Sequence, residues 1–299
     1  MFLKFHFVKY KNISFLVSVI ISILSIILIY TRGINFNIEF TGGVNIEIQN
    51  KDYDLDALRK NLEKNQILGS VNLVNMNHVS IKAGAKSTDQ IELNNTIERI
   101  KKVIEELDSQ PKYLQVEAIG PQMGEELIKS GVLAVGLAFV GIMTYVAFRF
   151  EWQFGIGVLV ALMHDALISL GFASLTQIEF NISSIAAILT IIGYSVNDSI
   201  VVYDRIRENI RIVRSQNLPD IINNSIIQTL SRTTLTVFTT IIANLALVLF
   251  GGEAIFPFAI LVLFGFIFGT YSSIFVSAPF LLVLIDENKY LNRKQSTPQ

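Results

Sequence analysis

The sequence contains no cysteine and only three histidines, and charged residues fill only 16% of its 299 positions. Without cysteine, disulfide bonds, thiolate catalysis and cysteine metal sites are excluded. His6, His78 and His164 lie far apart in the sequence, which argues against a metal centre built on them. Soluble proteins carry roughly 25% charged residues. The low charge, together with 51% hydrophobic residues, therefore indicates a membrane protein, and the net charge of −1 gives no bias toward nucleic acid.

Several catalytic motifs are also missing. The sequence has no G-x-S-x-G elbow, no phosphate-binding Walker loop and no H-E-x-x-H run, so ATP hydrolysis and metal-assisted proteolysis have no support. An intramembrane aspartyl protease could use Asp165 and Asp198 as a dyad, but only the presence of two acids in apolar segments favours it. We expect no enzyme active site and no cofactor.

The first apolar segment runs from about residue 13 to 30 and follows Lys4, Lys9 and Lys11. It is longer than the 7–15 residue apolar region of a signal peptide, and no A-x-A-like cleavage site follows. We interpret it as a transmembrane helix. The positive charge before it predicts that the tail 1–12 is cytoplasmic.

Residues 31–128 are polar and predict one extramembrane domain. Hydrophobic periodicity indicates the order strand, helix, two strands, helix, strand. The expected strands lie at Val44–Ile48, within Val71–Ile81 and at Tyr113–Ile119, and the expected helices at Leu55–Lys64 and Asp89–Leu107. This order predicts an α+β, ferredoxin-like βαββαβ fold, with His78 in a strand or turn.

Five more apolar segments follow and bring the predicted total to six transmembrane helices. They lie near 131–149, 155–176, 182–203, 233–250 and 256–284, and we group them as a five-helix domain at 129–285 before a tail at 286–299. Each is long enough to cross the roughly 30 Å apolar core of a bilayer.

Positive charge is distributed unequally among the connections. It gathers in the N-terminal tail, the 204–232 loop and the C-terminal tail, whereas the loops around Glu179 and Glu253 contain no lysine or arginine. By the positive-inside rule, both termini are predicted to be cytoplasmic and residues 31–128 extracytoplasmic.

One acid lies inside the fourth apolar segment. Asp198 belongs to the stretch GYSVNDSIVVYDRIREN at 193–209, and Arg232 stands at the start of the fifth segment. Because a charge in the bilayer is costly, such residues are candidate functional sites, and we expect them to pair. A carboxylate that exchanges a proton for an arginine partner could act as a proton relay. The alternative is a static ion pair that only fixes the helix register.

His164 and Asp165 lie near the middle of the third apolar segment and complete the candidate site. They either take part in the relay or satisfy a hydrogen bond between helices. Ser231 is a candidate cap for the fifth helix. Small residues predict close helix packing in the second span, where Gly136 and Gly141 lie, and in the sixth, which contains Gly265-x-x-x-Gly269.

Taken together, several stretches resemble the SecD/SecF family of protein-export proteins, within the resistance–nodulation–division superfamily. They are NFNIEFTGG at 35–43, IGPQMGEEL at 119–127, His164-Asp165, GYSVNDSIVVYDRIREN, SRTT at 231–234 and GTYSSIF at 269–275. The resemblance implies that Asp198 and Arg232 match the family's proton-conducting acid and arginine. It also implies use of the proton-motive force, together with SecD, in late preprotein translocation across the inner membrane.

The resemblance also implies a set of partners. SecD would supply the other half of a twelve-helix pseudo-symmetric unit. The remaining partners would be the SecYEG translocon, YajC and YidC, a preprotein substrate and the lipid bilayer. The domain at 31–128 would then be periplasmic. Two rivals stay open at this stage, a proton-coupled small-molecule exporter of the same superfamily and a structural assembly subunit without proton transport.

Overall fold

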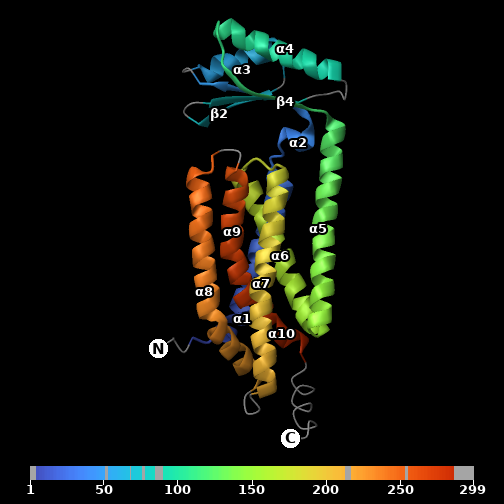
Figure 1. Cartoon of the computed structure of the whole chain (residues 1–299), viewed down its shortest axis with the longest axis vertical. Helices are drawn as coiled ribbons and strands as arrows, with labels where there is room; N and C mark the ends of the chain where they lie inside the picture. The colour runs from blue at the N-terminus through green and yellow to red at the C-terminus, as the bar shows by residue number, and fades with distance from the viewer. Residues whose placement is uncertain are drawn as a thin grey trace. The chain divides into compact units, whose positions relative to one another are not determined.

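The computed structural model describes residues 5–50, 53–67, 69–75, 78–84, 90–212, 217–252 and 255–285. The chain divides into two compact units (Figure 1). The helical unit comprises the chain up to Asn35, then Val135–Ile178 and the part from Ser183 onward. The α/β module comprises Phe36–Ala134 together with the short segment Glu179–Ile182.

Long helices dominate the chain. A 3-10 turn, η1 (Phe7–Tyr10), leads into α1 (Lys11–Arg32), and the later helices are α5 (Pro121–Arg149), α6 (Trp152–Thr176), α7 (Ile182–Ile212), α8 (Leu218–Phe250), α9 (Phe256–Ser272), the π-helix η2 (Ser273–Ser277) and α10 (Ala278–Leu284). Within the described residues, six helical segments are long and apolar enough to cross a membrane. The prediction of six transmembrane helices is therefore confirmed.

The segment 204–232, predicted to be a loop, is mostly helical. Helix α7 continues to Ile212 and α8 already begins at Leu218. Asn217 caps α8, since its side-chain oxygen accepts from the backbone N–H of Asp220 at 2.9 Å. Ser231 therefore lies inside α8, and its predicted capping role is wrong. The apolar pattern missed these extensions because it ends where the helices become polar.

Other predictions concern residues that lie outside the described part of the structure. They are the tail 286–299, the loop residue Glu253, and Asp89 at the start of the predicted second helix of the domain.

The α/β module confirms the predicted element order. A short helix, α2 (Ile38–Thr41), precedes β1 (Gly43–Gln49), α3 (Leu55–Lys64), β2 (Gly69–Asn75), β3 (His78–Ala83), α4 (Gln90–Leu107) and β4 (Tyr113–Ile119). The strands form one antiparallel sheet in the order β2-β3-β1-β4. This is the order of a ferredoxin-like fold, with His78 as the first residue of β3.

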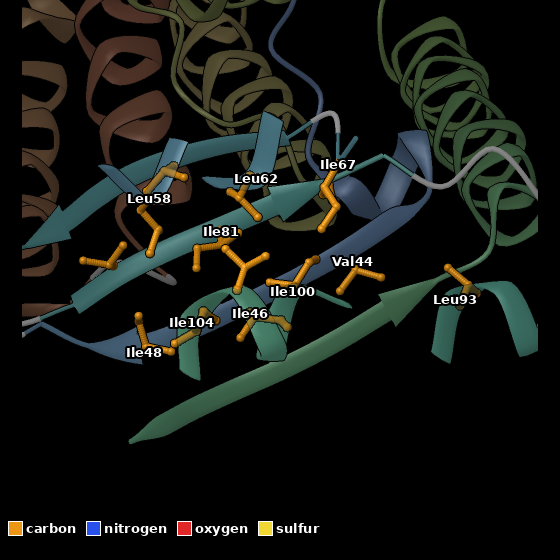
Figure 2. Close-up of a cluster of buried hydrophobic side chains, with 14 residues drawn as sticks. Val44, Ile46, Ile48, Leu58, Leu62, Ile67, Ile81, Leu93, Ile100 and Ile104 are labelled. Atoms are coloured by element: carbon orange, nitrogen blue, oxygen red, sulfur yellow. The ribbon is translucent and has the colours of Figure 1, made fainter. Parts of the chain in front are cut away.

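Alternation along the strands creates the core of the module. Val44, Ile46 and Ile48 in β1 point to one face and are fully buried. Leu58 from α3 and Ile100 from α4 meet them there, and Figure 2 shows these side chains gathered between the sheet and its helices. The module thus has its own hydrophobic core.

Gly43 supports a specific stability prediction. Its φ of +147° is unfavourable for other residues, and an added Cβ would lie 2.5 Å from the Ala83 carbonyl oxygen. We expect Gly43→Ala to destabilise the module by about 2 kcal/mol or more, through strain and overpacking. Hydrogen exchange of the β1 and β3 amides in the full chain measures this loss. Gly84→Ala is the control, because no atom of the described residues lies within 4 Å of its added Cβ. Equal protection in both variants would contradict the prediction.

Candidate functional site

Asp165 lies in α6 and is completely buried. Its Oδ2 accepts hydrogen bonds from Ser195 Oγ of α7 at 2.5 Å and from Ser272 Oγ of α9 at 2.6 Å. Its Oδ1 lies 3.0 Å from His164 Nδ1. Three side chains from three helices thus replace the water that this carboxylate would bind in solution.

Asp198 lies in α7 and is only 8% exposed. Thr233 of α8 donates its hydroxyl to Asp198 Oδ1 at 2.6 Å, and Ser273 donates to Oδ2. Each carboxylate oxygen therefore has a hydroxyl partner, and these partners come from different helices. The sequence pattern alone gives neither donor this role.

Ser272 and Ser273 connect the two acids. They are adjacent in the chain, yet Ser272 donates to Asp165 and Ser273 donates to Asp198. Successive side chains on a helix point about 100° apart, so one dipeptide can reach acids on two neighbouring helices. The site is therefore one cluster containing both carboxylates.

The backbone beside these serines is unusual. Ser273–Ser277 forms a π-helix, and such turns occur frequently at functional sites. The buried Tyr203 hydroxyl of α7 donates to the Ser277 carbonyl at 3.0 Å and accepts from Ser277 Oγ at 2.6 Å. Gly157 of α6 leaves room for this hydroxyl, because an added Cβ there would collide with it. The π-helix is thus held at both ends by α7.

Glycines allow α9 to approach α7. A Cβ at Gly265 would collide with Ile191, and one at Gly269 would lie 3.4 Å from the Ser195 Cβ. The predicted close packing of the sixth span is confirmed. Gly136 and Gly141 of α5 differ, since no described atom lies within 4 Å of the Cβ that either could carry. Within this chain, the predicted close packing at those two glycines is wrong.

Arg232 does not form the expected ion pair. Its side chain is exposed, and no ion pair within the described part of the chain joins it to Asp198. Arg232 and Thr233 are consecutive on α8, so the turn that directs Thr233 toward Asp198 directs Arg232 elsewhere. Arg232 is nevertheless the chain neighbour of Thr233, which donates to Asp198. The structure places the arginine near the cluster, without a direct bond to the acid.

His164 leaves one nitrogen free inside the protein. Its side chain is buried, its Nδ1 faces Asp165, and its Nε2 has no hydrogen-bond partner among the described residues. The Ser199 hydroxyl of α7 is likewise buried without a partner there. Each imidazole nitrogen can donate or accept a hydrogen bond, so the cluster contains two buried hydrogen-bonding groups without a described partner.

The structure therefore brings together Asp165, His164 and Asp198, whereas Arg232 is the exposed chain neighbour of Thr233, which contacts Asp198. Sequence reasoning missed Ser195, Ser272 and the carboxylate-binding role of Ser273. The adjacent serines in the predicted sixth span are the sequence signal that could have identified them, because buried hydroxyls need hydrogen-bond partners.

The chain is similar in sequence to known protein-export proteins over almost its whole length. Residues 99–287 match the family model described as "Protein export membrane protein SecD/SecF, C-terminal". The protein translocase subunit SecF of Rickettsia conorii is 48% identical over 297 residues, which cover 98% of this chain and 95% of that protein.

Solved structures agree with this match. A crystal structure of SecDF from Thermus thermophilus, described as a translocon-associated membrane protein, superposes with a TM-score of 0.84 at 35% identity over 95% of this chain. This chain covers 39% of that longer one. A SecDF structure in a super-membrane-facing form gives a TM-score of 0.72 at 33% identity, with coverage of 99% and 41%. The chain belongs to the SecD/SecF family of protein-export membrane proteins.

Proposed function

We propose that this chain works with SecD to couple the proton-motive force to a late step of preprotein translocation. The observation that carries the proposal is the buried cluster in which adjacent serines join Asp165 and Asp198. Family membership supports the export role, because relatives are named protein translocase subunits, which are transporter components and not enzymes.

Protonation would change the hydrogen bonding of this cluster. An ionised carboxylate only accepts hydrogen bonds, whereas a protonated one also donates. Ser273 and Thr233 both donate to Asp198, so a proton on that acid would weaken one of these bonds or turn its hydroxyl into an acceptor. Because the donors lie on different helices, the proton would bias the packing of α7 against α8 and η2.

The proton gradient is an adequate energy source for such a change. Moving one elementary charge across 100 mV supplies about 2.3 kcal/mol. Coupling free energies between sites in proteins are typically about 1–3 kcal/mol. One proton per cycle is therefore enough to shift a two-state equilibrium in the helical unit.

The charge distribution supports a topology for this function. Lys9 precedes α1, Lys11 is its first residue, and Arg205, Arg207 and Arg211 lie near the end of α7. We place these positions in the cytoplasm of a cell inner membrane, with both termini on that side and the α/β module in the periplasm. The module would then face the preprotein as it emerges.

Partner chains complete the proposed machine. The matched Thermus chain is much longer than this one and is described as translocon-associated. SecD would supply the corresponding helices here, and the complex would act beside SecYEG, with YajC and YidC as further partners. Helix α5, whose membrane segment is not buried in the chain, offers one surface for lipid or a partner.

The Asp198→Asn variant tests whether proton exchange at Asp198 drives export. We expect gradient-driven completion of preprotein translocation to fall about fivefold or more, because an amide cannot exchange a proton. The measurement uses vesicles containing the partner proteins, with and without a proton gradient. Asp204→Asn is the matched control, since that acid is exposed on the same helix and pairs with Arg149 at 3.4 Å. Normal gradient-driven export in assembled Asp198→Asn complexes would contradict the proposal.

Arg232→Met tests the nearby charge. We expect a loss of similar size, since the positive charge next to Thr233, the α8 partner of Asp198, is removed. Arg211→Met, an exposed arginine at the end of α7, serves as control. The amount of complex is measured in parallel by co-purification with SecD. If export fell only in proportion to lost complex, the structural assembly role would be correct instead.

A further inference from the structure

Two motifs of the α/β module have no role in the buried cluster. They are NFNIEFTGG at 35–43 and IGPQMGEEL at 119–127. In the structure both contribute to the surroundings of one short helix, α2 (Ile38–Thr41). The contacts of this helix indicate the role of both motifs.

Helix α2 is fixed on several sides. Asn37 caps it by accepting the backbone N–H of Ile38 at 2.5 Å. Gly42, with φ of +70°, and Gly43 turn the chain directly into β1. Gly124, at the start of α5, packs so closely that an added Cβ would collide with the Phe40 carbonyl. The side chains of α2 therefore have little freedom relative to the sheet.

The fixed helix holds the connection between α6 and α7. The Phe180 carbonyl accepts the Asn37 backbone N–H at 3.0 Å. The Phe180 ring lies 5.8 Å from the Phe36 ring and 6.1 Å from the Phe40 ring, centroid to centroid. Glu179 forms an ion pair with Lys82 of β3. Accordingly, Glu179–Ile182 clusters with the α/β module.

Glu39 of α2 forms a hydrogen bond with the first residue of α7. Its Oε2 accepts the backbone N–H of Ile182 at 2.7 Å, and Ile182 is the first residue of α7. The first N–H groups of a helix lack partners within it, and a carboxylate there also interacts favourably with the helix dipole. Glu39 thus acts as a cap for α7 supplied from α2.

Helix α7 is also the helix that carries Asp198, about four turns beyond Ile182. Between its two ends the backbone hydrogen bonds of a helix are internal, so a displacement of its first turn can pass along its axis. We infer that Glu39 is a positioning residue, which fastens the start of α7 to the α/β module so that protonation of the buried cluster moves the module. This inference rests on the proposed function.

The alternative role for the Glu39 bond is to stabilise the fold and nothing more. If the Glu39 bond only stabilised the fold, its loss would lower proton transfer and export together, or would leave both unchanged. A coupling role separates the two, since Glu39 bonds to Ile182 and makes none of the described hydrogen bonds of Asp198. The test therefore measures proton flux and preprotein completion in the same vesicles, containing the full chain and SecD.

For Glu39→Ala we expect proton flux within about twofold of wild type and gradient-driven export reduced about fivefold or more. Glu39→Gln should retain at least half of the export, because its amide oxygen still accepts the Ile182 N–H. Glu117→Ala is the matched control, as that carboxylate bonds to Gln115 within its own strand at 2.5 Å.

The outcomes separate the two proposals. If wild-type export did not respond to the gradient, the proposed function would fail and the variants would not be compared. If wild type responded and Glu39→Ala responded equally, the positioning role of Glu39 would be overturned. A glutamine variant as defective as the alanine variant would also overturn it.

Because the sequence contains no cysteine, a pair of introduced thiols can be cross-linked specifically within this chain. Lys82→Cys with Glu179→Cys replaces the ion pair by two thiols, which a short bis-maleimide can join. We expect the cross-linked chain to retain gradient-driven export, because the connection stays on the module throughout the cycle. Export in the unlinked double variant and its loss after cross-linking would show that the connection must detach, and would overturn the inference.

Discussion

Two carboxylates inside a bundle of apolar helices are the constraint on which the rest of the helical unit depends. An acid near the centre of a bilayer costs about 2.5–3.5 kcal/mol, and burial of an acid is tolerated when polar partners replace water. Asp165 and Asp198 obtain those partners from hydroxyl groups. The adjacent serines at 272 and 273 must then face two helices at once, and this requirement orients α9 and η2.

Several packing features follow from that orientation. Glycines at 265 and 269 bring α9 close to α7, and the buried Tyr203 hydroxyl satisfies the carbonyl of Ser277. Small residues therefore set the distance between helices, while hydroxyls determine their rotation. A change in the protonation of either acid would alter a structure whose parts already depend on one another.

The α/β module is linked to the buried acids through the connection between α6 and α7. Its own core is independent, built from alternating residues of the sheet and from α3 and α4. The segment Glu179–Ile182 nevertheless clusters with it and leads directly into the helix that bears Asp198. In the proposed account, the continuous helix α7 and the Glu39 bond at its first residue are the route from the cluster to the module.

Hydrophobic periodicity predicted the strands, helices and membrane spans well, because burial in either a core or a bilayer imposes a regular pattern. The helix at Leu55–Lys64 and the strand at Tyr113–Ile119 have the predicted bounds. The pattern failed where helices leave the apolar region, and so α7 and α8 extend into the segment expected to be a loop.

The candidate site was predicted less completely. The cost of burying charge identified Asp165 and Asp198 from the sequence, since an acid in an apolar span is costly unless it has a partner or a function. Their partners could not be identified, because serine and threonine are common in helices and only rotation about the helix axis decides which of them face an acid. Arg232 illustrates the same point, as a turn of about 100° separates it from the threonine that contacts Asp198.

Proton coupling requires that the buried acids change protonation as the complex works. Infrared difference spectroscopy of the chain with SecD in membranes tests this requirement most directly, because a protonated carboxyl group has its own C=O stretching band. We predict that the wild-type spectrum gains, as the pH falls, one carboxylic component that is missing in Asp198→Asn, beside the bands of the exposed acids, which both chains share. A carboxylic region unchanged by that substitution would contradict proton coupling at this cluster.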